Sequence, residues 1–439
     1  MTGPTAPVRP DTAARLLNAV ATVQAATHQP SLVAGVVRNG DLVWSAARGG
    51  ETGGAEPGTG TQYRIGSITK SMTAVLVVQC RDDGLIDLAE PVSTVLGDVP
   101  FGATTVHQLL SHTGGLPAEP AGPWWERRDG GDFAVLSDEV RDQAVVVPPG
   151  RQQHYSNLGY ALLGQVVAKL RGRPWPDVVR QWLLDPLDMR RTTYHPEPPH
   201  ASGYSVHPWS GRLDPEPHTD TRAMAPAGQL WSTVADLARY LSFWLDPDPG
   251  VLTPTSAAEM RIPVGGRADE GLEASYGLGL SLGARPGRLV VGHGGSMPGF
   301  LAGFAVDIAH GTGAVALSNG TLGDTPGLPQ ALLDIVAKSE PRLPGVWQPE
   351  PQLAGVDELL GPWFWGDTPL TLVVQGGHLL LDSANSGRRS RFVASGRDTW
   401  RGLDQYFTGE TLTVRRNSDG SVAGLELATY ELTRTPYTR

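Results

Sequence analysis

Cysteine and lysine are scarce in this 439-residue sequence, and the shortage of cysteine excludes a class of structure. Cys80 is the only cysteine, so the chain cannot form an internal disulfide. Lysine occurs only at Lys70, Lys169 and Lys338, so arginine supplies nearly all of the 35 basic residues. Because the net charge is -10 and the basic residues form no cluster, we expect no nucleic-acid partner.

Long apolar runs and metal-binding patterns are also missing. No run approaches the roughly 18 apolar residues that a membrane helix requires, and residues 1–10 lack the basic region and apolar core of a secretory signal. The sequence contains no His-Glu-x-x-His motif, no cysteine pair, no Walker loop and no Rossmann fingerprint. We therefore expect a cytoplasmic protein with no membrane segment, no metal and no cofactor.

The order of the expected elements predicts an α/β fold for residues 1–340. A helix is expected over residues 11–27, with Asp11 as its N-cap. Strands at 32–37 and 42–47 follow, and Asn39-Gly40 joins them in a hairpin. The next part, about residues 85–270, is expected to be mostly helical, with long Pro/Gly-rich loops.

Short apolar strands return after this helical part, at 288–291, 299–307 and 313–317, before a helix at 328–338. Strands from both ends of the domain therefore bracket a helical insertion. Residues 341–351 are rich in proline and are expected to form a linker. Beyond them, alternating apolar runs separated by turn signals predict a small all-β domain at 352–439, built as a partial or closed barrel.

Ser67 and Lys70 lie three residues apart in a stretch that continues as an apolar helix. If a helix begins near Ser67, Lys70 returns to the same face one turn later. Unpaired N–H groups at a helix N-terminus favour negative charge on an attacking oxygen, and a buried lysine can serve as its base because burial disfavours the charged form. The alternative is an accidental pair on a surface helix, because the motif alone is weak.

Tyr155-Ser156-Asn157 follows a Pro-Pro-Gly turn and precedes a helix expected to begin at Gly159. A tyrosine placed against a lysine can have a lowered pKa and shuttle protons, and an asparagine amide can donate to a substrate carbonyl. Taken alone, the segment is a helix N-terminus with Asn157 as the cap and Tyr155 packed against its neighbours.

His293-Gly294-Gly295-Ser296 follows a strand. Its glycines, Gly294 and Gly295, allow a substrate to lie along the strand edge, and a backbone N–H there can face an oxyanion. Taken alone, this is a histidine in a glycine-rich turn.

In this order, the three segments resemble the motifs of the serine β-lactamase and penicillin-binding-protein superfamily, above all its class C-like and esterase branch, which uses Tyr-x-Asn as second motif. Segments 109–117, 226–233 and 276–279 are similar to further signatures of that branch. The resemblance covers about residues 12–340 and implies an antiparallel sheet flanked by helices. Residues 352–439 resemble the lipocalin-like β domain that some members carry.

The resemblance also implies a role for each residue. Ser67 is the acylated nucleophile, Lys70 is its base and Tyr155 passes a proton to the leaving group. Asn157 positions the substrate, and the backbone N–H groups of Ser67 and Ser296 form the oxyanion hole.

One departure from the family pattern narrows the activity. His293 stands where β-lactamases usually have the lysine or arginine that binds the β-lactam carboxylate, which disfavours a true β-lactamase. Our leading hypothesis is a standalone penicillin-binding-protein-type thioesterase. It would act on a small-molecule or peptidyl substrate, in particular a carrier-protein-bound nonribosomal peptide thioester, which it releases and macrocyclises. Open alternatives are an esterase, D-aminopeptidase or β-lactamase-type hydrolase, and a catalytically silent binding or sensor module.

Trp124 and Trp125 stand in a loop after the segment at 109–117. They either line a substrate groove or anchor the loop. The sequence favours neither.

Overall fold

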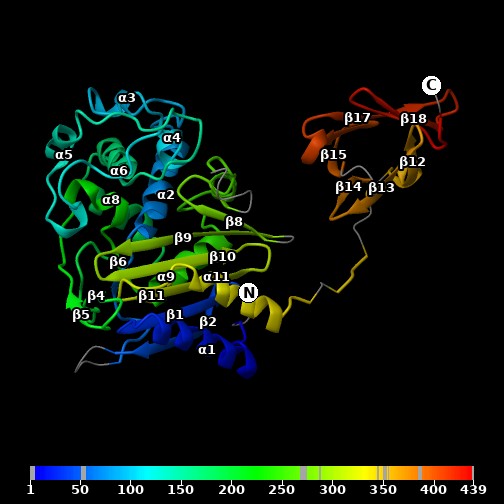
Figure 1. The fold of residues 1–439 in the computed structure, drawn as a ribbon. Coiled ribbons are helices and arrows are strands. Elements are labelled where there is room, and N and C mark those ends of the chain that lie inside the picture. Colours follow the sequence, from blue (N-terminus) through cyan, green and yellow to red (C-terminus); the bar gives the residue numbers. More distant parts are fainter. Residues whose placement is uncertain are drawn as a thin grey trace. The chain divides into compact units, whose positions relative to one another are not determined.

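The computed structural model describes residues 5–50, 56–266, 274–285, 288–343, 346–349, 353, 355–383 and 388–437. The chain divides into two units, Met1–Arg342 and Leu343–Arg439 (Figure 1). The predicted linker, residues 341–351, spans the boundary between them. Its residues 344, 345, 350 and 351 lie outside the described residues, as does residue 352, where the sequence predicts the second domain to begin.

The first unit is built on a seven-stranded antiparallel sheet with the strand order β2–β1–β11–β10–β9–β8–β7. Its strands are β1 (Ser31–Arg38), β2 (Asp41–Gly49), β7 (Ala274–Tyr276), β8 (Ser281–Arg285), β9 (Arg288–Met297), β10 (Phe300–Asp307) and β11 (Thr312–Ser318). The hairpin predicted at Asn39-Gly40 is confirmed. Both residues have a positive φ, 47° and 91°, as the favoured two-residue turn between twisted strands requires.

Helices cover both faces of this sheet because its central strands are apolar on both sides. In β1, Val33 and Val37 face one core, whereas Leu32, Ala34 and Val36 face the other. α2 (Ile68–Asp82) and α9 (Val234–Leu245) contact the first face, and α1 (Pro10–Ala26) and α11 (Leu328–Ser339) pack on the second (Figure 1). The predicted α/β fold is therefore confirmed.

The N-terminus of α1 differs from the prediction. Arg9, not Asp11, occupies the N-cap position, and its side chain makes no capping bond. Pro10 takes the first helical position, where its fixed φ suits the helix and its missing N–H costs nothing. Asp11 lies in the first turn, where a negative charge interacts favourably with the helix dipole.

Between the two groups of strands the chain forms helices joined by long loops, and in α2 every residue from Ile68 to Cys80 is buried. The other helices are α3 (Ser93–Leu96), α4 (Val106–Leu110), α5 (Phe133–Glu139), α6 (Asn157–Arg171), α7 (Trp175–Val179), α8 (Ala225–Gly228) and α10 (Pro254–Glu259). Two short ribbons pair β3 (Tyr63–Arg64) with β6 (Trp231–Ser232) and β4 (Tyr204–Val206) with β5 (Leu213–Pro215). Because β3 ends three residues before Ser67, the first ribbon fixes the approach of the chain to α2.

The second unit is an eight-stranded antiparallel sheet in which each strand pairs with the next along the chain. Its strands are β12 (Gly361–Trp365), β13 (Thr368–Gln375), β14 (His378–Asp382), β15 (Ser390–Gly396), β16 (Thr399–Gly402), β17 (Thr411–Arg416), β18 (Val422–Leu427) and β19 (Tyr430–Leu432). Phe364 and Thr433 exchange backbone hydrogen bonds of 2.8 and 3.0 Å, which bring the first and last strands together. The predicted all-β domain is confirmed as a barrel-like sheet around its own apolar core.

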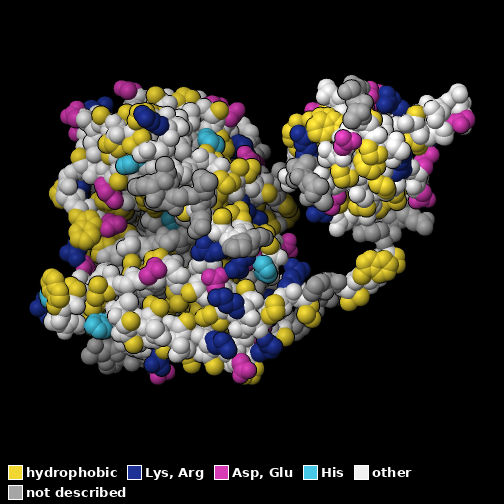
Figure 2. All heavy atoms as spheres, turned by 45° about the vertical axis from the view of Figure 1, so that its right-hand side comes forward, with side chains coloured by type: hydrophobic (Ala, Val, Ile, Leu, Met, Phe, Trp, Pro, Cys, Tyr) yellow, Lys and Arg dark blue, Asp and Glu magenta, His cyan; other side chains and the backbone are white. Residues whose placement is uncertain are grey.

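Charge is mixed over the surfaces of both units. In the view of Figure 2, Lys and Arg side chains are interspersed with Asp and Glu side chains on each unit. Within the described ranges, no helix combines the length and the apolar character that crossing a lipid bilayer demands.

Candidate active site

Ser67 lies where three segments of the chain meet. It occupies the N-cap of α2, directly after Gly66, whose φ of 51° lies in the left-handed region. Lys70 follows one helical turn later, and its Nζ donates to Ser67 Oγ at 2.8 Å. The serine is half-buried, whereas the lysine is fully buried. The structure therefore brings the two side chains together at the start of a buried helix, not on a surface helix.

The surroundings of Lys70 favour its neutral form. Its Nζ also donates to the carbonyl oxygen of Ala227 in α8 at 2.6 Å, and lies 5.0 Å from the ring centre of Tyr155. Burial lowers the pKa of Lys70 from 10.5 to about 7, although the carboxylates of Glu119 and Glu126 oppose this shift. Desolvation outweighs both carboxylates, so near neutral pH a large fraction of Lys70 can accept a proton.

Tyr155 is fully buried, and its pKa differs from the one that we expected. Burial raises the pKa of the Tyr155 hydroxyl well above its ordinary value, and a hydrogen bond with Ser67 opposes this only in part. The lowering that we expected from a nearby lysine is therefore wrong, because the desolvation of the fully buried phenol dominates its pKa. Tyr155 is a neutral phenol beside Ser67, able to donate a proton.

Asn157 also differs from one expectation. The N-cap of α6 is Ser156, whose Oγ accepts from the Gly159 N–H at 3.1 Å and donates to Pro117 O at 2.6 Å. Asn157 is instead the first residue of α6, and its Nδ2 donates to Glu119 Oε1 at 2.7 Å. The interpretation of Asn157 as a cap is wrong because the shorter serine side chain reaches the N–H groups of the first turn. The side chain of Asn157 is therefore held by the carboxylate of Glu119, which also acts electrostatically on Lys70.

His112 connects the second motif to the preceding loop. Its backbone carbonyl accepts from the His154 N–H at 2.8 Å, and its Nδ1 accepts from the Ser156 N–H at 3.1 Å. The residues on either side of Tyr155 are thus both bonded to His112, and the two rings lie 4.2 Å apart between centroids. His112 is buried and has a positive φ of 57°, so a strained backbone holds this arrangement.

His293, on β9, is buried beside another tyrosine. Its Nδ1 lies 2.5 Å from the carbonyl oxygen of Gly294, which can only accept, so Nδ1 carries the proton. Its Nε2 then accepts from the Tyr276 hydroxyl at 2.9 Å. Burial and, to a smaller extent, the charge of the neighbouring Lys70 lower the pKa of His293 to about 4. His293 is therefore neutral near pH 7 and presents no positive charge to a substrate carboxylate.

The glycines of the first and third motifs allow two backbone segments to touch. A Cβ added to Gly295 would lie 2.0 Å from the carbonyl oxygen of Ile65, and one added to Gly66 would lie 2.6 Å from the backbone N of Ser296. Side chains would force these segments apart. The contact brings the backbone of Ser296 next to that of Ser67, as an oxyanion hole made from their two N–H groups requires. Gly294 faces elsewhere, with Pro326 3.1 Å from an added Cβ.

The two adjacent tryptophans have different environments. Trp125 is buried, and its Nε1 donates to Glu119 Oε2 at 2.6 Å. Trp124 is 56% exposed, and its Nε1 donates to Glu126 Oε2 at 2.8 Å. Of the two alternatives for this loop, anchoring describes Trp125, while Trp124 remains available at the surface.

Reasoning from sequence missed several groups of the site. Glu119 holds Asn157 and Trp125, Tyr276 holds His293, and Ala227 accepts from Lys70. Tyr276 and Ala227 stand in the segments 276–279 and 226–233, whose similarity to family signatures could have marked them. Over the part of the chain that the structure describes, no group of three or more His, Cys, Asp or Glu side chains is arranged to hold a metal ion.

Comparison with known proteins agrees with this geometry. A family model described as Beta-lactamase matches residues 16–337, and one described as a domain of unknown function (DUF7586) matches residues 352–434. The first match spans most of the chain, so the chain belongs to the beta-lactamase family, which is a family of serine hydrolases.

Curated relatives carry names from the same superfamily. Penicillin-binding protein 4 of Amycolatopsis lactamdurans is 32% identical over 316 residues, which cover 67% of this chain and 81% of that protein. Beta-lactamase-like protein 2 of Dictyostelium discoideum is 30% identical over 254 residues, 53% of this chain. The chain spans only 46% of the length of that second relative.

Solved structures share the fold. The octameric penicillin-binding protein homologue from Pyrococcus abyssi aligns with a TM-score of 0.66 and 23% identity, covering 95% of this chain and 99% of that one. A D-stereospecific amidohydrolase from a Streptomyces species aligns with a TM-score of 0.62 and 26% identity, covering 75% of this chain and 99% of that one.

Proposed function

We propose that the protein is a serine acyl-transfer enzyme in which Ser67 forms an ester with a peptide-like acyl group. The observation that carries the proposal is the buried Lys70, which donates to Ser67 Oγ and has a pKa lowered to about 7. A neutral lysine in hydrogen-bond contact with a serine hydroxyl is a general base in the position that nucleophilic catalysis requires.

In the first half-reaction, Ser67 Oγ attacks the acyl carbon and its proton passes to neutral Lys70. The bond to the leaving thiol, alcohol or amine then breaks. The leaving group takes a proton from the Tyr155 hydroxyl, which regains one from the ammonium of Lys70. In the second half-reaction, water or an amine attacks the ester and restores the Ser67 hydroxyl.

Charge around the site favours an amine as the second nucleophile. Glu119 and Glu126 both act electrostatically on Lys70 and Tyr155, and His293 is neutral. A negative potential attracts the protonated form of an amine to the site and disfavours a substrate carboxylate. We therefore also propose a specific reaction, in which the terminal amine of a peptidyl thioester attacks its own acyl group and releases the peptide as a ring. Since carrier-protein thioesters are made inside cells, a cytoplasmic location is part of this proposal.

A second activity has support from the comparisons. The aligned Streptomyces structure is described as a D-stereospecific amidohydrolase, and the fold covers nearly all of it. Hydrolysis of a D-amino-acid amide uses the same Ser67 ester, with water as the acceptor.

The test uses a synthetic peptidyl thioester with a free N-terminus, incubated with wild type and with Ser67→Ala. Mass spectrometry follows both the protein and the products. We expect a product lighter than the linear acid by one water, formed only by wild type. An N-acetylated peptide is the matched control and can give only linear acid.

Linear acid alone from the free peptide would remove the cyclase proposal and leave a hydrolase, to be assayed next on D-amino-acid amides. If wild type forms neither an acyl adduct with thioesters or esters nor a phosphonyl adduct with a fluorophosphonate, the acyl-transfer proposal itself is wrong.

A further inference from the structure

The short helix α8 presents the carbonyl oxygens of its last turn to side chains of α2. Ala227 O accepts from Lys70 Nζ at 2.6 Å, and Pro226 O accepts from Thr73 Oγ1 at 3.0 Å. Such carbonyl groups have no partner inside their own helix. A neutral lysine has two N–H groups and one lone pair. When one N–H is bound to Ala227 O, the lone pair can face the hydroxyl of Ser67, 2.8 Å away.

Gln229, the residue directly after α8, connects the two ends of the segment that contains this helix. Its Oε1 accepts from the Thr221 N–H at 3.1 Å and from Thr221 Oγ1 at 2.8 Å. Its Nε2 donates to the carbonyl oxygens of Thr219 at 3.2 Å and Tyr194 at 3.3 Å. Gln229 is buried, so water cannot replace these bonds. The side chain therefore closes residues 221–229 into a loop that carries α8.

Arg64 connects this loop to the strand that leads to Ser67. Its Nη2 donates to Gln229 Oε1 at 2.9 Å and to the carbonyl oxygen of Thr219 at 3.2 Å. Its Nη1 donates to Thr219 Oγ1 at 3.4 Å. Arg64 belongs to β3 and precedes Ser67 by three residues. The guanidinium therefore fixes the position of α8 relative to the nucleophile.

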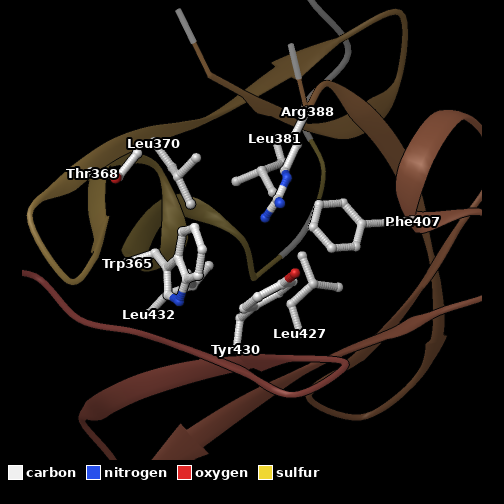
Figure 3. Close-up of a pocket in the computed structure, with 9 residues that line it drawn as sticks. All are labelled: Trp365, Thr368, Leu370, Leu381, Arg388, Phe407, Leu427, Tyr430 and Leu432. Carbon is white, nitrogen blue, oxygen red and sulfur yellow. The ribbon is translucent and has the colours of Figure 1, made fainter. Parts of the chain in front are cut away.

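Charge pairing does not account for an arginine at this position. Arg64 is buried, and among the described residues no acidic side chain lies within ion-pair distance of it; the carboxylates of Glu126 and Asp220 attract it from farther away. Its Nε has no hydrogen-bond partner there either. Arg388 in the second unit, by comparison, lies against aromatic rings that stabilise its charge (Figure 3). Burying the charge of Arg64 is costly, and what the residue provides is a fork of donors that reaches two residues at once.

We propose that Arg64 and Gln229 are positioning residues for acyl transfer, which hold α8 so that the Ala227 carbonyl orients Lys70 toward Ser67. The inference rests on the proposed function, because neither side chain is hydrogen-bonded to Ser67 or Lys70 and both act through α8. If α8 shifts, Lys70 loses the acceptor that orients its lone pair, and the transfer of the Ser67 proton slows.

Labelling of the full chain by a fluorophosphonate tests this role. The amplitude of labelling counts the competent molecules, and the rate constant reports the attack of Ser67. Because a general base contributes about 10²–10⁴-fold, we expect Arg64→Met and Gln229→Met to lower the rate constant at least about tenfold. The loss should persist on the plateau at high pH, where Lys70 is neutral, since its orientation and not its charge has changed.

Tyr240→Phe is the matched control. It removes another buried hydrogen bond to α2, the 3.0 Å bond that Tyr240 donates to Ser71 Oγ from α9. Its rate constant should stay within about twofold of wild type. Far-UV circular dichroism at the assay temperature verifies that each variant is folded.

The outcomes separate this inference from the proposed function. A wild-type rate constant in both Met variants would overturn the positioning role and leave Ser67 as nucleophile, whether the amplitude is full or reduced. An equal loss of rate in Tyr240→Phe would also overturn it, because any lost bond would then have this effect. No labelling of Ser67 in wild type would refute the proposed function and this inference with it.

If neither Met variant folds, Arg64→Lys takes their place. Lysine retains the charge but lacks the fork that reaches both Gln229 and Thr219. This variant should label at least about threefold more slowly than wild type, and an unchanged rate would overturn the proposal.

Discussion

His112 offers the sharpest test of how the site is held, because one residue supplies three separable features. It accepts from the Ser156 N–H, it has a φ of 57°, and its ring packs on Tyr155. Asparagine keeps an acceptor at the position of Nδ1 and tolerates a positive φ. Glycine tolerates the positive φ but has no acceptor, and alanine has no acceptor and is strained at this φ.

The structure gives the expected order of stability as wild type, His112→Asn, His112→Gly, His112→Ala. Leaving the buried Ser156 N–H unpaired costs about 1–3 kcal/mol, and an alanine at this φ adds about 1 kcal/mol. We therefore expect His112→Ala to lose about 2–4 kcal/mol, with lost ring packing adding to this, and His112→Gly to lose about 1 kcal/mol less than alanine. Urea unfolding followed by far-UV circular dichroism measures these differences.

The kinetic expectation follows from the same contacts. Because the bonds of His112 flank Tyr155, loss of the acceptor should lower kcat more than it raises KM. His112→Asn should keep kcat within a few-fold of wild type, whereas glycine and alanine lose at least tenfold on a thioester substrate. If asparagine and alanine lose kcat equally, or if glycine is less stable than alanine, the assignment of these roles is wrong.

Three further expectations concern charge. The acylation rate of Ser67 should rise with pH to a plateau with a midpoint near 7, because Lys70 must be neutral; a midpoint near 10 in a fluorophosphonate assay would contradict its lowered pKa. Glu119→Gln removes a charge that raises the pKa of Lys70, so the midpoint should move to lower pH, and an upward shift would refute this electrostatic effect. Arg288→Met should cost about 3–5 kcal/mol in urea unfolding, since it leaves the fully buried Asp307 without its arginine. Asp334→Asn, at the more exposed end of the same network, should cost under about 1 kcal/mol, and equal losses would argue against burial as the cause.

The features predicted well from sequence are those that depend on near neighbours. Ser67 and Lys70 meet because a helical turn separates them, and Asn39-Gly40 makes a hairpin because both residues accept a positive φ. Strands with regular apolar alternation were also predicted. β8 escaped prediction because only Leu282 of its five residues is buried, so it carries little apolar alternation.

Features that depend on distant parts of the chain could not be predicted. The amide of Asn157 is bound by Glu119, 38 residues earlier, and nothing in either local sequence indicates this bond. The pKa of Tyr155 was assigned the wrong direction for a related reason. Burial raises the pKa of the Tyr155 phenol, and that burial depends on segments far from Tyr155 in sequence.

Comparison of Lys70 with a buried arginine explains why the site requires a lysine, in a chain that contains few lysines. Arg64, six residues earlier, is almost as deeply buried, yet burial lowers its pKa only to about 10. A guanidinium in this setting stays charged at neutral pH and cannot take a proton from serine. An ammonium starts lower, and the same kind of burial brings the pKa of Lys70 to about 7. Arginine supplies nearly all other positive charges of the chain. Burial therefore yields a side chain that can accept a proton near neutral pH only where lysine replaces arginine.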